Sequence, residues 1–162
     1  MHYRWNFPED NLQFVHHHFL YAQRDTPERA EKTEHMMNRM RHVTEVFGVT
    51  EQSQQLVEAL YKEYLDVLNR HFEHYPYLLG WKPCIGDFGL LAPMYAHLGR
   101  DPHPASLMQK RALRVYRWVE RMNRADQDVP EFFTPGTDFL ENDEVPETLM
   151  AVLRAVAEDF VP

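Results

Sequence analysis

The chain has 162 residues, 44% of them hydrophobic, and a formal net charge of −8 at pH 7. This length suits a single domain, and the hydrophobic content is that of an ordinary globular core. The acidic balance argues against nucleic acid or an anionic membrane as a partner, because both require a basic face. No segment reaches the ~18 consecutive apolar residues of a membrane span, and the start has no signal-peptide core. The single cysteine, Cys84, excludes an internal disulfide, so we expect a cytoplasmic protein.

Helix start and stop signals predict three helices in the first half of the chain. The segments 7–10 and 25–28 each combine a proline with acidic residues, which is typical of a first helical turn. Gly48 can close the second helix, Thr50 can cap the third, and the third must end before Pro76. The apolar residues at helical spacing, expected to face inward, are Leu12, Val15, Phe19, Met36, Met37, Met40, Val43, Phe47, Leu56, Leu60, Tyr64, Leu68 and Phe72.

Three further helices are expected in the second half. The first spans about residues 85–98, with a kink at Pro93 because proline removes a backbone hydrogen bond. The second spans about residues 104–122, and the third starts at Pro146. Residues 123–145 have the composition of a long loop. This loop is rich in aromatic residues, which we expect to pack on the body of the protein: Phe132, Phe133 and Phe139.

The segment 85–98 carries the pattern that defines the predicted fold. Its apolar residues are Phe88, Leu90, Leu91, Met94, Tyr95 and Leu98. A helix that is apolar on most of its faces must be buried. The six glycines of the chain and the absence of alternating patterns argue against a sheet. We therefore predict an all-α bundle of about five to six helices, with a buried central helix at about residues 85–98.

Two groups of histidines look like metal sites but lack the geometry of one. Consecutive helix positions point about 100° apart, so the three histidines at 16–18 do not converge on one ion. His71 and His74 share a helix face, but two ligands alone make a weak site. We predict that the chain binds no metal.

Cys84 and Asp87 have the spacing of a capping box at the start of the helix at 85–98. The side chain of Asp87 can reach back to the free backbone amide three residues earlier. Asp87→Ala should therefore cost on the order of 1–2 kcal/mol, as lost caps do. Cys84 has two interpretations, because the helix dipole can make a thiol reactive, whereas lone cysteines are commonly packed. We favour the packed interpretation and assign no catalytic residue.

Three segments resemble the C-terminal helical domain of glutathione transferases. Residues 80–90 read Gly-x-Lys-Pro-Cys-Ile-Gly-Asp-Phe-x-Leu, which is similar to the capping region that opens the buried helix of that domain. Residues 97–102 contain the pairs His-Leu and Asp-Pro, and residues 118–121 read Trp-x-x-Arg, which are also similar. The resemblance covers residues 50–122. It implies a glutathione transferase C-terminal-like bundle, with residues 1–162 as a single domain.

The resemblance implies a supporting role in glutathione conjugation. In that family this domain supplies the hydrophobic pocket for the electrophilic co-substrate and part of the dimer interface. The residue that activates the thiol lies in an N-terminal thioredoxin-like domain, whose strands do not precede residue 50 here. We therefore expect the chain to belong to a longer homodimeric protein that uses glutathione as co-substrate, and to be inactive and free of cofactor alone. The pocket candidates are Tyr3, Trp5, Phe7, Met94 and Tyr95.

Two other functions fit the same sequence. Domains of this kind also serve as non-catalytic protein-interaction scaffolds, and the aromatic loop at 130–140 and the negative charge would suit docking. A free-standing binder of hydrophobic small molecules is the third possibility, because clustered methionines at 36–40 would suit an adaptable pocket. Conjugation of glutathione would support the first function, a stable protein partner the second, and binding of apolar dyes by the chain alone the third.

Overall fold

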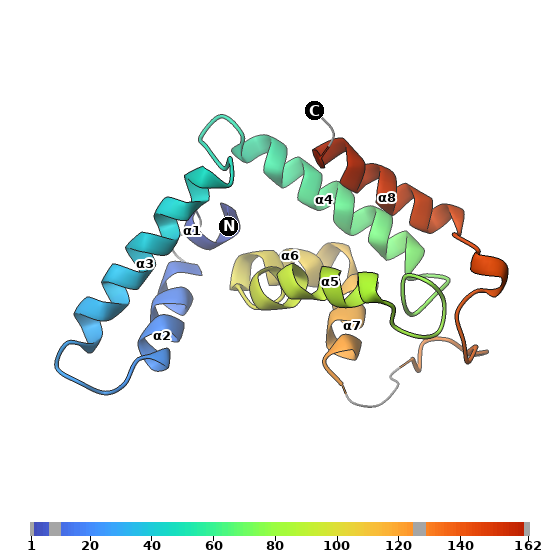
Figure 1. Ribbon diagram of the computed structural model, residues 1–162, viewed down its shortest axis with the longest axis horizontal. Helices are drawn as coiled ribbons and strands as arrows, with labels where there is room; N and C mark the ends of the chain where they lie inside the picture. The colour runs from blue at the N-terminus through green and yellow to red at the C-terminus, as the bar shows by residue number, and fades with distance from the viewer. Residues whose placement is uncertain (1, 7–10, 125–128, 161–162) are drawn as a thin grey trace.

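The chain is all-helical over the residues that the structure describes (Figure 1). This computed structural model describes residues 2–6, 11–124 and 129–160. Within these ranges eight α-helices follow one another, and no β-strand occurs. The predicted all-α class is therefore confirmed. The helix start predicted at residues 7–10 lies outside the described residues.

The first three helices form a unit with a small core of its own. α1 (His2–Asn6) is followed by α2 (Gln13–Ala22) and α3 (Arg29–Val46), and α2 and α3 lie side by side in opposite directions (Figure 1). α3 begins directly after the predicted start signal. The buried side chains that these helices share are Trp5, Val15 and Met37.

Only part of the predicted inner face of α3 is covered. Met37 is buried, but Met36 and Met40 are exposed, and Phe47 after the helix is 70% exposed. In the described structure α3 packs mainly on α2. A single neighbouring helix covers a narrower strip of the α3 surface than the apolar face that the spacing of the methionines predicted. Gly48, at φ +74°, closes the helix as predicted.

α4 (Gln54–His71) and α8 (Glu147–Phe160) form one side of the main body. They lie side by side, although they are separated widely in sequence (Figure 1). The inner face predicted for α4 is confirmed at Leu68 and Phe72, which are buried, whereas Leu56 is exposed. This helix pair therefore covers the C-terminal part of α4 more fully than its start.

Three shorter helices complete the main body, and two of them contact α4. They are α5 (Ile85–Pro93), α6 (Pro102–Arg111) and α7 (Leu113–Met122), and the 3-10 helix η3 (Glu141–Asp143) precedes α8. The most completely buried apolar side chains of the main core are Leu65, Leu68, Phe72, Met94, Met108, Val115 and Trp118.

The helix predicted at 104–122 is divided in two. Ala112, with φ −140° and ψ 65°, separates α6 from α7. The first turn of α7 receives a partner from α4, because the Asn69 side-chain oxygen accepts a 3.0 Å hydrogen bond from the N–H of Arg114. The stabilising group comes from another helix, so the local spacing did not predict the break.

The central helix predicted at 85–98 is correct in position but wrong in burial. α5 begins at Ile85 as expected, yet Ile85 is 91% exposed and Phe88 is 58% exposed. Among the described elements α5 packs mainly on α7 and on the segment that follows it. One apolar face therefore remains at the surface, while Asp87 and Met94 are buried on the opposite side.

The helix type changes at Pro93, where a kink was predicted. α5 ends at Pro93 and continues as the π-helix η2 (Met94–Leu98). Pro93 has no N–H to donate to the carbonyl four residues earlier. In η2 the N–H of Gly99 bonds to the carbonyl of Met94 five residues earlier, at 2.6 Å. Met94 is buried in this segment, whereas Tyr95 is exposed.

The aromatic loop between α7 and α8 packs less than predicted. The ring of Phe132 meets Trp81 edge-on, with centroids 5.3 Å apart. Phe133, however, is 99% exposed, and Phe139 is also exposed. The loop is held by its backbone, since the carbonyl of Asp138 accepts a 3.0 Å hydrogen bond from the N–H of Trp81. Backbone anchoring of this kind does not require every aromatic side chain to be buried.

A buried ion pair attaches α1 to the main body. Nε and Nη2 of Arg4 donate hydrogen bonds to the two carboxylate oxygens of Asp101, at 2.8 and 2.6 Å. Asp101 is almost fully buried, and bidentate pairs of this type are among the stronger polar contacts. The ring of Tyr3 also lies 5.2 Å from that of Tyr61 on α4. The first helix is therefore held in place despite its short length.

Candidate functional site

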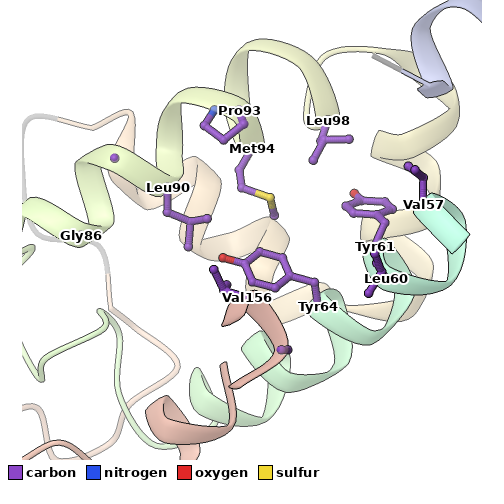
Figure 2. Close-up of a pocket in the computed structure, with 12 residues that line it drawn as sticks. Val57, Leu60, Tyr61, Tyr64, Gly86, Leu90, Pro93, Met94, Leu98 and Val156 are labelled. Atoms are coloured by element: carbon purple, nitrogen blue, oxygen red, sulfur yellow. The ribbon is translucent and has the colours of Figure 1, made fainter. Parts of the chain in front are cut away.

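An apolar cavity lies between α4, α5, η2 and α8 (Figure 2). Its volume is about 520 Å³, and sites for small molecules usually measure ~300–1,000 Å³. Aliphatic side chains form most of the wall. The lining includes two tyrosines and two glycines among apolar side chains: Tyr61, Tyr64, Gly86, Gly89, Leu90 and Met94.

The sequences of two facing helices explain why this space is empty. On α4 the lining side chains recur between residues 57 and 64 at intervals of three and four, so they share one face. On α5, Gly86 and Gly89 lie three residues apart and have no side chains to fill the gap. A Cβ atom added to Gly89 would meet no other atom within 4 Å. Large residues on one helix therefore face small residues on the other across an open space.

A buried carboxylate fixes α5 beside the cavity. Asp87 is fully buried and accepts hydrogen bonds from the backbone N–H groups of Cys84 (2.9 Å) and Leu78 (3.2 Å). It also accepts a 2.9 Å hydrogen bond from Nε1 of Trp118 on α7. The contact with Cys84 is the predicted capping box, and the other two contacts were not predicted. Together they hold the first turn of α5 against the core.

Cys84 has a structural place in this network. Its Sγ donates a hydrogen bond to Oδ2 of Asp87 at 3.2 Å. Burial raises the pKa of the Cys84 thiol, which therefore stays protonated at neutral pH. A protonated thiol is a poor nucleophile. These observations favour the packed interpretation of Cys84 over the reactive one.

The polar side-chain oxygens in the described wall of the cavity belong to two tyrosines. Burial raises the pKa of Tyr64 to about 12 and also raises the pKa of Tyr61, so both phenols stay neutral at pH 7. None of the described lining residues carries a charge. The cavity is therefore suited to a neutral, mostly apolar molecule.

Two of the predicted pocket residues lie close to this cavity, and one of them lines it. Met94 is fully buried and forms part of the wall. Its neighbour Tyr95 is exposed and lies outside the lining, with its ring 5.8 Å from the guanidinium carbon of Arg100. The prediction of a pocket position therefore agrees with the geometry of this cavity for Met94 and not for Tyr95.

Of the three pocket residues predicted near the N-terminus, Tyr3 and Trp5 do not line this cavity. Tyr3 is buried against the ring of Tyr61, and Phe7 lies outside the described residues. Trp5 is buried in the N-terminal core and borders a different pocket of about 390 Å³. In that pocket Nε1 of Trp5 and Oγ1 of Thr44 are buried without a hydrogen-bond partner among the described residues.

Four residues that shape the cavity were not predicted as pocket residues from the sequence: Tyr61, Tyr64, Gly86 and Gly89. Tyr64 was expected on an inner face, but as core. A signal was available in the two glycines, because glycine in a helix interior costs about 1 kcal/mol relative to alanine. Two glycines on one face of an apolar helix indicate that space is needed there.

The described residues contain no group of three or more His, Cys, Asp or Glu side chains that could hold a metal ion. Within the same ranges, no helix has both the length and the apolar character required to cross a membrane. Comparison of the chain with family models, with curated proteins and with solved structures gives no match. The resemblance to glutathione transferases therefore depends on the motifs between residues 80 and 121.

Proposed function

We propose that this chain is the C-terminal-like helical domain of a glutathione transferase-like protein, and that its cavity holds the hydrophobic co-substrate. The observation that carries the proposal is the cavity of about 520 Å³ with its uncharged, mainly aliphatic wall. The motif residues Asp87 and Trp118 support it, since they bond to each other and fix a helix of that wall. Part of the proposal is a cytoplasmic location, where thiols are kept reduced.

In this proposal the chain removes the electrophile from water and positions it, and the thiol comes from glutathione. No residue of this chain is assigned to activate the thiol, because in the family that residue belongs to the thioredoxin-like domain. We therefore expect the chain alone to bind apolar molecules without conjugating them. A domain that only binds such molecules would share the same cavity, so binding and conjugation need separate tests.

Filling the cavity tests the binding part. Gly89→Leu places a side chain in open space, and Gly89→Ala adds a single methyl group at the same position. Both variants replace a helical glycine, so the helix itself should gain stability. We expect Gly89→Leu to lower the affinity for an apolar fluorescent dye by about tenfold or more, which corresponds to ~1.4 kcal/mol, and Gly89→Ala to lower it far less. Unchanged dye affinity in a folded Gly89→Leu protein would exclude the cavity as the binding site.

Conjugation is tested on the native protein from its source cells. It should transfer glutathione to an aryl halide, and Gly89→Leu should raise the KM for the halide more than the KM for glutathione. A native mass near the 19.4 kDa of this chain, with dye binding but no conjugation, would instead support a free-standing binder of hydrophobic molecules.

The homodimer expected of a glutathione transferase-like protein has a candidate contact surface on the exposed face of α5. Ile85 and Phe88 lie three residues apart on this helix, and both are exposed. Neighbouring exposed apolar side chains are typical of contact surfaces. We propose that a second copy of the chain packs here to form the homodimer. Sedimentation should then show a dimer that Ile85→Lys with Phe88→Lys converts to a monomer, and a monomeric wild-type protein would contradict this.

A further inference from the structure

The two hydroxyl groups in the cavity wall differ in their partners. Oη of Tyr61 donates a 3.4 Å hydrogen bond to the carbonyl oxygen of Pro104. The hydroxyl of Tyr64 has no hydrogen-bond partner among the residues that the structure describes. Figure 2 shows the ring of Tyr64 extending away from α4 toward the side of the cavity where Leu90 lies. One polar group is therefore presented to an otherwise apolar space.

The Tyr64 hydroxyl is suited to donate a hydrogen bond to a bound molecule. Tyr64 is half-buried and lines the cavity, where the aliphatic wall offers its hydroxyl no acceptor, so a ligand that supplies an acceptor adds a hydrogen bond in an apolar setting. Because burial raises its pKa to about 12, the phenol keeps its proton at neutral pH. Phenols donate hydrogen bonds more readily than they accept them, since the oxygen lone pair is delocalised into the ring. An acceptor on the ligand is therefore the better complement.

We propose that the ligands of this cavity are neutral apolar molecules with one acceptor oxygen, such as aryl ketones, whose carbonyl accepts a hydrogen bond from Oη of Tyr64. This inference rests on the proposed apolar binding site and names the class of molecule that it selects. The described wall has no cation to pair with a carboxylate, and the net charge of −8 disfavours anions. Aliphatic side chains such as Leu90 and Met94 would contact the remainder of the ligand.

A matched pair of small molecules tests the proposal. Benzophenone and diphenylmethane have the same two rings and differ in a carbonyl against a methylene group. We expect Tyr64→Phe to weaken benzophenone binding by about 2- to 12-fold, the range of one net hydrogen bond, and to leave diphenylmethane binding unchanged or slightly stronger. Tyr116→Phe is the control, because Tyr116 is half-buried on α7 and does not line the cavity. Circular dichroism confirms that each variant is folded.

The infrared band of the benzophenone carbonyl gives a second readout. A hydrogen bond lowers the stretching frequency, so the band should lie lower in the wild-type complex than in the Tyr64→Phe complex. If both proteins bind both molecules equally and show the same band, the inference is overturned while the cavity remains the binding site. If the wild-type protein binds neither molecule nor an apolar dye, the proposed binding site is overturned together with the inference.

Discussion

Nε1 of Trp118 donates a 2.9 Å hydrogen bond to Oδ1 of Asp87, and this contact joins α7 to the first turn of α5. Both side chains are fully buried. The ring of Trp118 also stacks on Phe72 at the end of α4, with centroids 5.4 Å apart. The pair therefore links three helices, and two of them, α4 and α5, form facing walls of the cavity.

Asp87→Ala should destabilise the fold by more than the loss of a helix cap. The donors from Leu78, Cys84 and Trp118 would all lose a buried acceptor. We expect the free energy of unfolding to fall by about 3 kcal/mol, compared with ~1–2 kcal/mol for a cap alone. Urea denaturation followed by circular dichroism measures the loss.

Asp66→Ala is the matched control for Asp87→Ala. The carboxylate of Asp66 also accepts two hydrogen bonds, from Arg111 at 2.8 and 2.7 Å, but both side chains are more than 40% exposed. Solvent screening should keep this loss much smaller than the loss at Asp87. Equal losses at the two positions would show that the buried network around Asp87 adds nothing to stability.

Trp118→Phe should retain an aromatic ring against Phe72 but remove the donor to Asp87. We expect a loss of about 2–3 kcal/mol, because hydrogen bonds to charged groups contribute more than neutral ones. A double-mutant cycle with Asp87→Ala isolates the pair, and its coupling energy should be about 1–2 kcal/mol. A coupling energy near zero would mean that the contact does not contribute.

The capping contact between Cys84 and Asp87 was predictable from the sequence, but the hydrogen bond from Trp118 to Asp87 was not. Cys84 and Asp87 are three residues apart in one helix turn, so spacing alone indicated the contact. Trp118 lies 31 residues from Asp87 and approaches it only when α7 packs on α5. The spacing of residues within a helix contains no information about which other helix will cover it.

The burial of individual side chains was also predicted poorly, because the spacing within one helix does not show which other helix covers it. Apolar spacing correctly located α5, but Phe88 remains exposed because the described elements cover only one side of the helix. Tyr64 was assigned to a buried face and does point inward, yet it faces Gly86 and Gly89 across a cavity. Sequence periodicity predicts a direction, whereas the packing of the opposite wall decides whether that direction is filled.

His71 should make the fold less stable at mildly acidic pH. Its Nδ1 lies 3.0 Å from Oγ1 of Thr148, and its Nε2 lies 3.1 Å from the carbonyl oxygen of Tyr77. Burial lowers the pKa of His71 below its ordinary 6.5, although the charge of Asp87 opposes the shift. The unfolded chain then binds a proton that the folded chain does not, so stability is complete above about pH 7 and falls as the pH drops through 6.5.

The free energy of unfolding between about pH 7.5 and 5.5 measures this effect, and one such group contributes at most ~1.4 kcal/mol per pH unit. His71→Gln should be less stable at the upper pH but should lose less stability as the pH falls. Some pH dependence should remain, because burial also lowers the pKa of His97. An unchanged slope in His71→Gln would contradict the role assigned to His71.

Gly80→Ala should cost more than Gly48→Ala, although both glycines have positive φ. At Gly80 (φ +110°) a Cβ atom would lie 3.0 Å from the backbone nitrogen of Leu140 and 3.2 Å from the carbonyl oxygen of Asp138. At Gly48 (φ +74°) it would meet nothing within 4 Å. We expect the free energy of unfolding to fall by about 3 kcal/mol in Gly80→Ala and by about 1 kcal/mol or less in Gly48→Ala. In both variants the alanine also lowers the entropy of the unfolded chain, which offsets part of the strain. Urea denaturation measures both, and equal losses would show that positive φ alone sets the cost.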